Sequence, residues 1–351
     1  MNDTTFPVPV VARLNAVTFP MMDVEREILS SVNAEIVELE GATDVEILNV
    51  AEKADAIMIV SAYLHGSVIR KMNRLKVISR MGTGTDKIDV EEATRCGIVV
   101  ANLPDFSTEE VADHTLALIL ASARRLKFYD ACIREGKRPQ SVAGMHRLAV
   151  QSLGIIGFGR IGKAVAKRAL AFGMRILVYD PLLTPGVKKE WNVEAVDFET
   201  VLSQSDYLSL LCPLTPDNRE MIRMDQLRMM KSGAILINTG RGELVNENDL
   251  VEALKTGVIH AAAVDVFSGI NVFDENGFST NHPYFNIDIV NKILLTPHVS
   301  ANSEEALMSS RIDSARAVVD VLGGFFPQHV VNRSVMPRFP LQNNFLEDIF
   351  R

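Results

Sequence analysis

The chain has 351 residues, of which 47% are hydrophobic and 23% are charged. These values are typical of a globular protein and exclude a disordered chain, and the length predicts two domains. The 36 Lys and Arg residues against 44 Asp and Glu residues give a net charge of −8. This balance argues against a nucleic-acid partner, since the chain as a whole generates no positive field.

The three cysteines, Cys96, Cys132 and Cys212, are far apart in the sequence and form no CxxC motif. This usage predicts neither a disulfide framework nor a metal site, and it favours a reducing, cytoplasmic location. The N-terminal sequence has no signal-peptide pattern, and no apolar run approaches the roughly 20 residues of a membrane span. We therefore expect a cytoplasmic protein without a membrane partner.

Short apolar runs alternate with amphipathic segments along the chain. This rhythm predicts an α/β fold, with parallel sheets covered by helices on both faces. Strands are expected at residues 56–61, 77–80, 98–102, 153–157, 176–180, 207–212, 234–238, 261–266 and 293–296.

Two long helices are expected between these strands. The first begins near Ser107, where Ser107 and Glu110 have the spacing of a capping box, and its stretch 116–121 is apolar on every side. Such a helix must be covered all round, either by the core of its own chain or by a second subunit. The second helix begins at residues 302–303 and ends before Gly323.

The sharpest local signal is the glycine motif Gly157-Phe-Gly159-Arg-Ile-Gly162, which follows an expected strand and begins a helical pattern. In a dinucleotide-binding turn, Gly157 permits the tight bend, Gly159 lets the backbone approach the pyrophosphate, and Gly162 allows close helix packing. Arg160 and Ile161 open the helix whose N-terminus faces the anion. The motif therefore predicts a cofactor site at these residues.

Asp180 ends the next expected strand, about 20 residues beyond the first glycine, where a ribose-binding carboxylate belongs. A carboxylate there accepts hydrogen bonds from the ribose hydroxyls and repels a 2′-phosphate. No Arg or Lys follows it over residues 181–184. The sequence therefore predicts NAD rather than NADP, and the alternative is a glycine-rich turn that binds nothing.

Further blocks resemble the D-isomer-specific 2-hydroxyacid dehydrogenase family in their order and spacing. They are RMGTGTDKID at 80–89, CPLT at 212–215, MKSGAILINTGRG at 230–242, DVF at 265–267 and LTPH at 295–298. The resemblance covers about residues 77–332. It implies two Rossmann-like domains, one flavodoxin-like and one NAD-binding, with the active site in the cleft between them.

The resemblance also implies a discontinuous substrate-binding domain. Residues 1–106 and 303–351 would form this domain, and residues 107–302 would form the NAD-binding Rossmann domain. The two long helices would be the crossovers between the domains, and the enzyme would be a homodimer.

Arg241 and His298 each follow an expected strand end, where α/β sheets bind ligands. A guanidinium can hold a carboxylate through two hydrogen bonds and polarise the adjacent carbonyl. A histidine can give the alkoxide its proton after hydride transfer. From position alone, Arg241 is equally consistent with a solvated loop, and an isolated histidine is more often structural; the family blocks favour function for both. The six other histidines lack this strand-end context.

The resemblance implies a glutamate that hydrogen-bonds the histidine, a few residues after the DVF block. Residues 268–270 carry no acid, and the long gap to His298 indicates an insertion at 268–281. Glu275 is the expected partner, with Asp274 and Asp288 as alternatives. The other interpretation of residues 274–277 is a solvated turn.

The resemblance places more residues around the ligands. Thr83 and Gly84 are expected to donate backbone N–H groups to the substrate carboxylate, which Arg241 also holds. Further cofactor contacts are expected from Cys212, Pro213, Thr239, Gly240, Asp265, His298 and Ser300.

We therefore predict an NAD-dependent oxidoreductase that interconverts a small, anionic D-2-hydroxy acid and its 2-oxo acid by hydride transfer. One alternative is a non-enzymatic NAD-responsive binding protein on the same scaffold, and another is a same-family enzyme that uses formate or phosphite. The pair Arg241 and His298 favours an enzyme, because a sensor has no chemical need for it.

Overall fold

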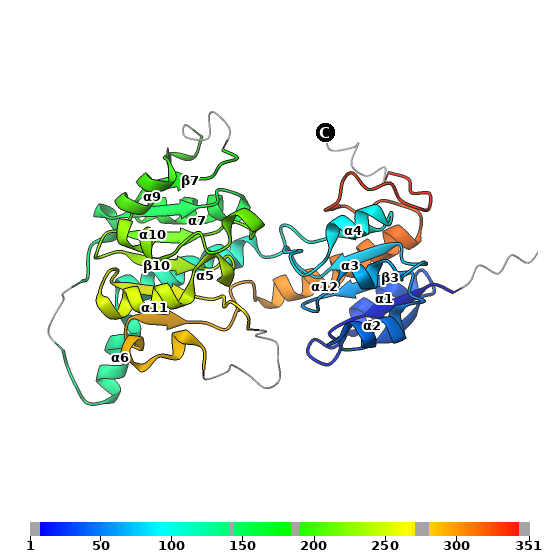
Figure 1. Ribbon diagram of the computed structural model, residues 1–351, viewed down its shortest axis with the longest axis horizontal. Helices are drawn as coiled ribbons and strands as arrows, with labels where there is room; N and C mark the ends of the chain where they lie inside the picture. Colours follow the sequence, from blue (N-terminus) through cyan, green and yellow to red (C-terminus); the bar gives the residue numbers. More distant parts are fainter. Residues whose placement is uncertain (1–7, 140–143, 184–189, 271–280, 344–351) are drawn as a thin grey trace, which may run out of the picture. The chain divides into compact units, whose positions relative to one another are not determined.

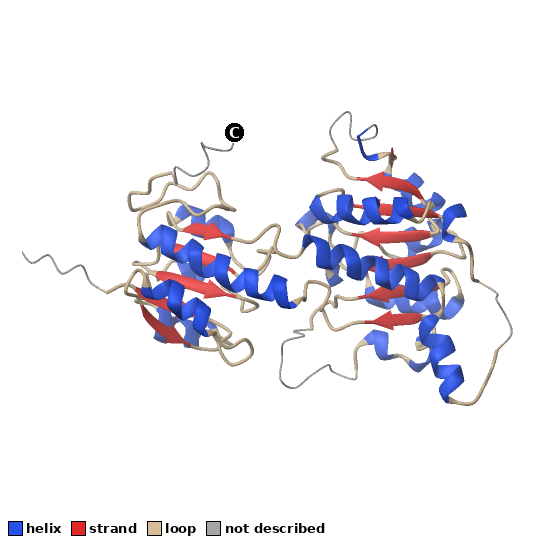
Figure 2. Cartoon of the chain, turned by 180° about the vertical axis from the view of Figure 1, so that it is seen from behind, coloured by secondary structure: helices blue, strands red, loops and turns tan. Residues whose placement is uncertain are grey.

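The computed structural model describes residues 8–139, 144–183, 190–270 and 281–343. The chain divides into two compact units, Met1–Phe106 with Ser303–Arg351 and Ser107–Asn302 (Figure 1). Each unit has a parallel sheet with helices on both faces, which confirms the predicted α/β class (Figure 2).

The sheet of the first unit has five parallel strands in the order β2-β1-β3-β4-β5, which is the order of flavodoxin-like sheets. The strands are β1 (Val10–Arg13), β2 (Glu35–Glu38), β3 (Ala56–Ile59), β4 (Val77–Arg80) and β5 (Val99–Ala101). One face packs against α2 (Asp44–Ala51), α3 (Gly66–Ile69) and α4 (Val90–Arg95), and the other against α1 (Asp23–Ser30) and α12 (Glu304–Leu322).

Strand β3 shows how the sequence builds this sandwich. Its four residues are all buried. Ile57 and Ile59 pack in the core on the α2 side, whereas Ala56 and Met58 pack in the core on the α12 side. Side chains alternate between the faces of a strand, so a central strand of a parallel sheet is apolar at every position.

The sheet of the second unit has seven strands in the order β12-β11-β10-β9-β6-β7-β8. The strands are β6 (Ser152–Ile156), β7 (Arg175–Tyr179), β8 (Glu194–Ala195), β9 (Tyr207–Leu210), β10 (Ile235–Asn238), β11 (Ala261–Val264) and β12 (Ile293–Leu295). The α-helices are α5 (Thr108–Ala123), α6 (Leu126–Arg134), α7 (Arg160–Ala171), α9 (Phe198–Gln204), α10 (Met224–Met229) and α11 (Glu247–Thr256). Short 3₁₀ turns lie at Leu148–Val150, Pro216–Asn218, Gly242–Leu244, Pro283–Phe285 and Ile287–Ile289.

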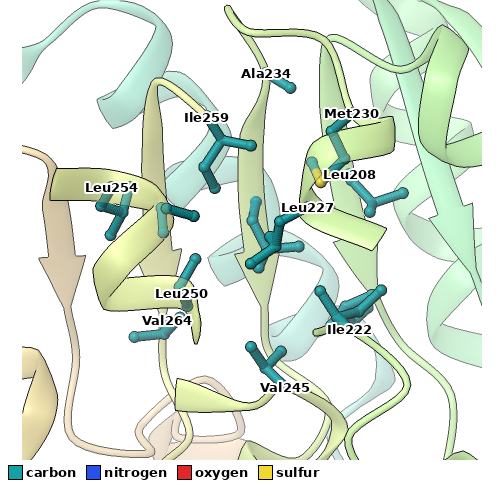
Figure 3. Packing of buried hydrophobic residues seen from close by; sticks show 14 of the residues in the cluster. Leu208, Ile222, Leu227, Met230, Ala234, Val245, Leu250, Leu254, Ile259 and Val264 are labelled. Atoms are coloured by element: carbon teal, nitrogen blue, oxygen red, sulfur yellow. The ribbon is translucent and has the colours of Figure 1, made fainter. Parts of the chain in front are cut away.

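Two hydrophobic cores hold this second sheet. On one face, Leu208 and Val264 of the strands pack with Leu227 of α10 and with Leu250 and Leu254 of α11 (Figure 3). On the other face, α5 and α7 pack on the strands. Burial of one such leucine contributes about 1.5–3 kcal/mol, so the two cores fix the strand ends that carry the predicted site.

The helix α5 is buried by its own unit. Leu116, Leu118 and Ile119 belong to the core beneath the sheet, whereas Ala117 is exposed. Of the two covers considered for this apolar stretch, the core of its own chain therefore accounts for most of it. The expected capping box is wrong in one respect: Ser107 is the N-cap, but its side chain makes no capping hydrogen bond.

The helix α12 has the predicted limits. The Ser303 hydroxyl accepts a capping hydrogen bond of 2.9 Å from Ala306 N, and the helix ends at Leu322, just before Gly323. Its inner face also carries polar groups. The hydroxyls of Ser314 and Ser79 of β4 lie 2.9 Å apart.

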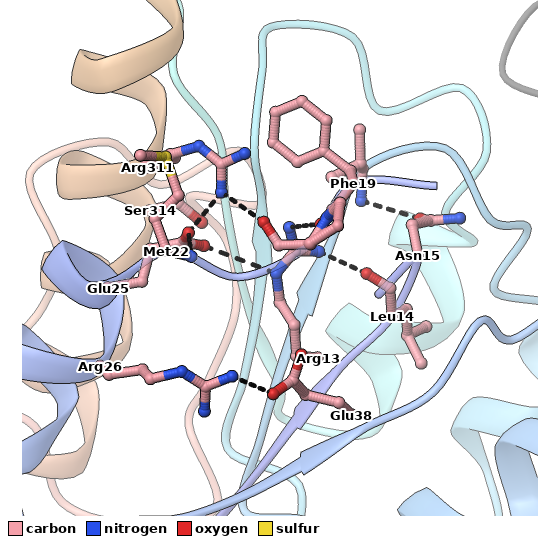
Figure 4. A network of polar contacts seen from close by, with 12 residues as sticks. Arg13, Leu14, Asn15, Phe19, Met22, Glu25, Arg26, Glu38, Arg311 and Ser314 are labelled. Atoms are coloured by element: carbon pink, nitrogen blue, oxygen red, sulfur yellow. Dashed lines mark hydrogen bonds and ion pairs between the residues drawn. The ribbon is translucent and has the colours of Figure 1, made fainter. Parts of the chain in front are cut away.

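A buried cluster of charges joins β1, α1 and α12 in the first unit (Figure 4). Arg13 and Glu25 are fully buried, with Arg13 Nε 3.5 Å from Glu25 Oε1. Arg311 donates a hydrogen bond to Glu25 Oε2, and its Cζ lies 4.1 Å from the Phe19 ring centroid. Burial lowers the pKa of Arg13, and the charge of Glu25 opposes that shift. One carboxylate thus serves two arginines and ties both helices to the first strand.

The described ranges hold neither a membrane-spanning helix nor a cluster of metal ligands. In these ranges, every helix is too short or too polar to cross a bilayer. The same ranges contain no group of three His, Cys, Asp or Glu side chains placed to hold a metal ion.

Candidate active site

The carboxyl ends of five neighbouring strands lie in one row in the second unit. The register partners along this row are Ile156, Leu210, Asn238, Val264 and Leu295, the last residues of β6, β9, β10, β11 and β12. The segments after them carry Gly157, Cys212, Pro213, Thr239, Gly240, Arg241, Asp265, His298 and Ser300. Neighbouring strands are about 4.8 Å apart, so the structure brings these segments to one edge of the sheet. The strand order reverses at β6, which is where such sheets bind ligands.

The turn between β6 and α7 has the geometry of a dinucleotide-binding loop. Gly157 has a φ of +96°, and a Cβ there would lie 2.5 Å from Cys212 N. A Cβ at Gly162 would lie 2.3 Å from the Gly157 carbonyl oxygen, which explains the close approach of the helix. A Cβ at Gly159 would meet no described atom within 4 Å, and Arg160 beside it is exposed. The residues therefore fit a pyrophosphate that approaches the backbone at Gly159.

Asp180 directly follows β7, beside this turn. Its Oδ2 accepts a hydrogen bond of 2.7 Å from Phe158 N, and its Oδ1 accepts one of 2.8 Å from Leu182 N. Ile161 lies half-buried in the first turn of α7. The two backbone donors fix the carboxylate beside the glycine turn.

The segment after β9 closes the other side of the glycine turn. Cys212 is half-buried against Gly157, and Pro213 beside it is exposed. Burial raises the pKa of the Cys212 thiol to about 11, so the thiol stays protonated near neutral pH. It is therefore suited to packing against a ligand rather than to nucleophilic attack.

The loop that carries Arg241 is held by a buried asparagine. Asn238 is fully buried, its Nδ2 donates to the Arg241 carbonyl oxygen at 2.9 Å, and its Oδ1 accepts from Gly240 N at 3.1 Å. Thr239 Oγ1 lies 2.8 Å from Thr115 Oγ1 of α5. These bonds fix the backbone of the loop at Arg241 and at the two residues before it.

The loop that carries His298 is held by Asp265, a fully buried carboxylate at the end of β11. Asp265 Oδ1 accepts from Thr296 Oγ1 at 2.7 Å and from Val299 N at 3.0 Å, and Oδ2 accepts from Ser300 N at 3.0 Å. The carbonyl oxygen of Asp265 also accepts from His298 N at 2.8 Å. The residue therefore organises the whole turn from 296 to 300.

Thr83 and Gly84 belong to the first unit, in the loop after β4. Thr83 Oγ1 donates to the Leu103 carbonyl oxygen at 2.9 Å, and the Thr83 carbonyl oxygen accepts from Asn102 Nδ2 at 2.7 Å. These bonds fix the loop on the segment that follows β5.

The acid expected beside His298 falls on residues that the structure leaves out: Asp274 and Glu275 lie outside the described ranges. The alternative Asp288 is exposed, and its Oδ2 lies 3.3 Å from Lys255 Nζ. Ser268 and His282, which lie on either side of residues 271–280, both contact Glu247. Glu247 Oε1 accepts a hydrogen bond of 2.8 Å from Ser268 N, and Glu247 Oε2 lies 2.8 Å from His282 Nε2.

One histidine that the sequence interpretation set aside touches this site. His114 of α5 lies with its Nε2 3.0 Å from Thr296 Oγ1 and 3.7 Å from Asp265 Oδ1. It is far from any strand end in the sequence, so strand-end context could not reveal it. The signal that remains is that the polar pair His114 and Thr115 directly precedes the apolar stretch 116–121 of the helix.

Comparison with known proteins decides the family. The model of the D-isomer specific 2-hydroxyacid dehydrogenase family, NAD binding domain, matches residues 116–300. The chain belongs to this family. A glyoxylate reductase from Thermococcus litoralis is 37% identical over 304 residues, which cover 84% of this chain and 88% of that protein.

Two further relatives show the breadth of the family. A D-3-phosphoglycerate dehydrogenase from Methanocaldococcus jannaschii is 38% identical over 326 residues, which cover 92% of this chain but 60% of that longer protein. The crystal structure of a D-lactate dehydrogenase from Aquifex aeolicus, complexed with NAD and lactic acid, superposes with a TM-score of 0.79. It is 29% identical and the match covers 90% of this chain and 96% of that chain.

Membership of the family confirms the predicted class of activity. The chain is an NAD-dependent oxidoreductase that acts on the CH–OH group of 2-hydroxy acids, and its predicted cofactor is confirmed as NAD.

Proposed function

We propose that this enzyme reduces glyoxylate, or a 2-oxo acid of similar size, with NADH. The observation that carries the proposal is the single row of strand ends, which sets Arg241 after β10 and His298 after β12. The two strands are separated by one strand, or about 10 Å, so groups reaching inward from both can meet on a small acid. The 37% identity to a glyoxylate reductase supports the small substrate.

In the proposed reduction, the planar fork of Arg241 grips the substrate carboxylate and polarises its carbonyl group. When bound, NADH supplies the hydride that the carbonyl carbon accepts. The negative charge then develops on the carbonyl oxygen, and protonated His298 donates its proton there. His298 takes the proton back in the oxidation direction, and Glu275 stabilises the protonated ring.

The division of labour between the units is also proposed. Residues 107–302 would bind NAD, with the glycine turn at the pyrophosphate and Asp180 on the ribose. The residues Arg160, Ile161, Cys212, Pro213, Thr239, Gly240, Asp265 and Ser300 would line the cofactor. Residues 1–106 with 303–351 would bind the substrate through the backbone N–H groups of Thr83 and Gly84.

We infer that the enzyme is a cytoplasmic homodimer. All three cysteines are free thiols, which suits a reducing compartment. In the described part of α6, no residue is buried, and Leu126 and Ile133 are 56% and 65% exposed. A second copy that covers this surface would give a sedimentation mass near twice the 38.7 kDa of one chain. A mass of one chain at low micromolar concentration would contradict the dimer.

A substrate panel tests the proposed function. NADH and NADPH are each offered with glyoxylate, hydroxypyruvate, pyruvate and phosphohydroxypyruvate, and NAD with formate and phosphite. We expect NADH oxidation with the small 2-oxo acids, and the D-isomer as the product from hydroxypyruvate and pyruvate. Binding of NADH without turnover of any compound would favour a sensor, and turnover of formate or phosphite alone would favour the other enzyme class.

A further inference from the structure

Two consecutive residues of α5 touch both loops of the proposed active site. Thr115 Oγ1 lies 2.8 Å from Thr239 Oγ1, in the loop that carries Arg241. His114 Nε2 lies 3.0 Å from Thr296 Oγ1, in the loop that carries His298. Thr239 follows β10 and Thr296 follows β12. The two consecutive helix residues therefore contact segments that lie on either side of β11.

The hydrogen bonds around Thr296 fix where the protons lie. The Asp265 carboxylate can only accept hydrogen bonds, and it accepts one of 2.7 Å from the Thr296 hydroxyl. Since a hydroxyl has one proton, Thr296 Oγ1 can only accept from His114. The Nε2 atom of His114 must therefore carry a hydrogen, which selects the tautomer protonated at Nε2 or the charged ring.

The turn held by this network has an unusual backbone. His298 has a φ of +54°, a conformation that residues other than glycine seldom adopt. Such a conformation persists only where the surroundings impose it. Here the His298 N–H is bonded to the carbonyl oxygens of Asp265 at 2.8 Å and Thr296 at 3.1 Å. Thr296 is hydrogen-bonded to His114, and Asp265 Oδ1 lies 3.7 Å from His114 Nε2.

We infer that His114 is a positioning residue: its Nε2–H orients the Thr296 hydroxyl onto Asp265 and so holds His298 at the reacting oxygen. This inference rests on the proposed role of His298. His114 would not touch the substrate. Its contribution would pass through the chain His114, Thr296, Asp265 and the backbone of His298, each link of which is within 3.0 Å.

Two substitutions at one position test the inference. His114→Leu removes the donor and retains an apolar side chain, whereas His114→Gln places an amide N–H near the position of Nε2. A misplacement of about 1 Å can cost on the order of 100-fold in rate. We expect His114→Leu to lower kcat about 10–100-fold, with smaller changes in the KM for the 2-oxo acid, and His114→Gln to recover most of kcat.

The matched control is Asp113→Asn on the same helix. Asp113 is 69% exposed and pairs with Arg168 at 2.6 Å, so its loss perturbs α5 without touching the strand ends. We expect wild-type kcat from this variant. A kcat for His114→Leu within twofold of wild type would overturn the inference, and so would a His114→Gln variant as impaired as His114→Leu.

A second readout separates this inference from the proposed function. The ring resonances of His298 are followed by NMR in histidine-labelled protein and assigned with His298→Asn. We expect them to shift in His114→Leu and to return toward wild type in His114→Gln. Unchanged resonances in His114→Leu would overturn the positioning role. Absence of turnover by the wild type would overturn the proposed function alone, since the resonances still report the loop.

Discussion

Asp180 Oδ2 accepts a 2.7 Å hydrogen bond from the backbone N–H of Phe158, so the carboxylate that follows β7 lies against the glycine turn that follows β6. In the proposed cofactor site, this contact would set a negative charge where the 2′-phosphate of NADP would lie. The preference for NAD is therefore expected to reside in one side chain.

The first prediction concerns that preference. Asp180→Ser should lower kcat/KM for NADH by roughly 10–150-fold, because charge-assisted hydrogen bonds to the ribose contribute about 1.5–3 kcal/mol. The same change should raise the relative use of NADPH. Asp180→Asn keeps the shape and an acceptor for Phe158, so it isolates the charge. Wild-type enzyme that uses NADPH as well as NADH would show that Asp180 does not select the cofactor.

The second prediction concerns the carboxylate anchor. Arg241→Lys keeps the positive charge but loses the planar fork, so kcat/KM should fall roughly 10–150-fold, which corresponds to about 1.5–3 kcal/mol. Arg223→Lys is the matched control, because Arg223 is 59% exposed and pairs with Glu220 at 2.9 Å on the surface. Equal kinetics for the two variants would remove Arg241 from the site.

The third prediction concerns the acid that assists His298. A neighbouring carboxylate stabilises the charged imidazole and raises its pKa. Reduction needs the charged ring, so the partner extends reductive activity toward higher pH, and its loss should move the falling limb to lower pH. Glu275→Gln should do this and lower kcat, by less than the loss of His298 does.

The controls for the third prediction are Asp274→Asn and Asp288→Asn. Asp288 is 58% exposed and is engaged by Lys255 at 3.3 Å, so its loss should be mild. A pH profile that moves with one of the aspartates, and not with Glu275→Gln, would transfer the role to that aspartate. If all three variants kept the wild-type profile, His298 would work without a carboxylate partner.

The fourth prediction concerns stability. Glu25→Gln leaves Arg13 buried at 0% exposure without its counter-charge, and Arg311 loses the same partner. Breaking a buried pair in this way costs about 3–5 kcal/mol. Arg26→Gln breaks only the exposed pair with Glu38 and should cost less than about 1 kcal/mol. Urea unfolding compares the two, and equal midpoints would contradict the role of the buried cluster.

The sequence predicted the strands best where they are apolar throughout. Strands β3 and β11 lie within the predicted ranges because every residue of a buried parallel strand tends to be hydrophobic. Strand β1 was not predicted, since Arg13 ends its apolar run, and only the fold supplies the Glu25 that makes this burial tolerable. The edge strand β2 was not predicted either, because Glu35 and Glu38 flank just two apolar residues.

The candidate site divides in the same way. Arg241 and His298 could be proposed from the sequence because each follows an expected strand end and lies in a block that resembles the family. His114 could not be found, because its partner Thr296 is 182 residues away and no local pattern links them. Glu275 stays a prediction, since it lies outside the described residues.

The role of His298 as proton donor is tested by the kinetics of His298→Asn with NADH and glyoxylate. Asparagine tolerates the positive φ of residue 298, so the loop is kept while the acid is removed. We predict a fall in kcat of about 10²–10⁴-fold, with the Kd for NADH, measured by fluorescence, within a few fold of wild type. A variant that keeps the wild-type kcat would contradict the assignment of His298 as the proton donor.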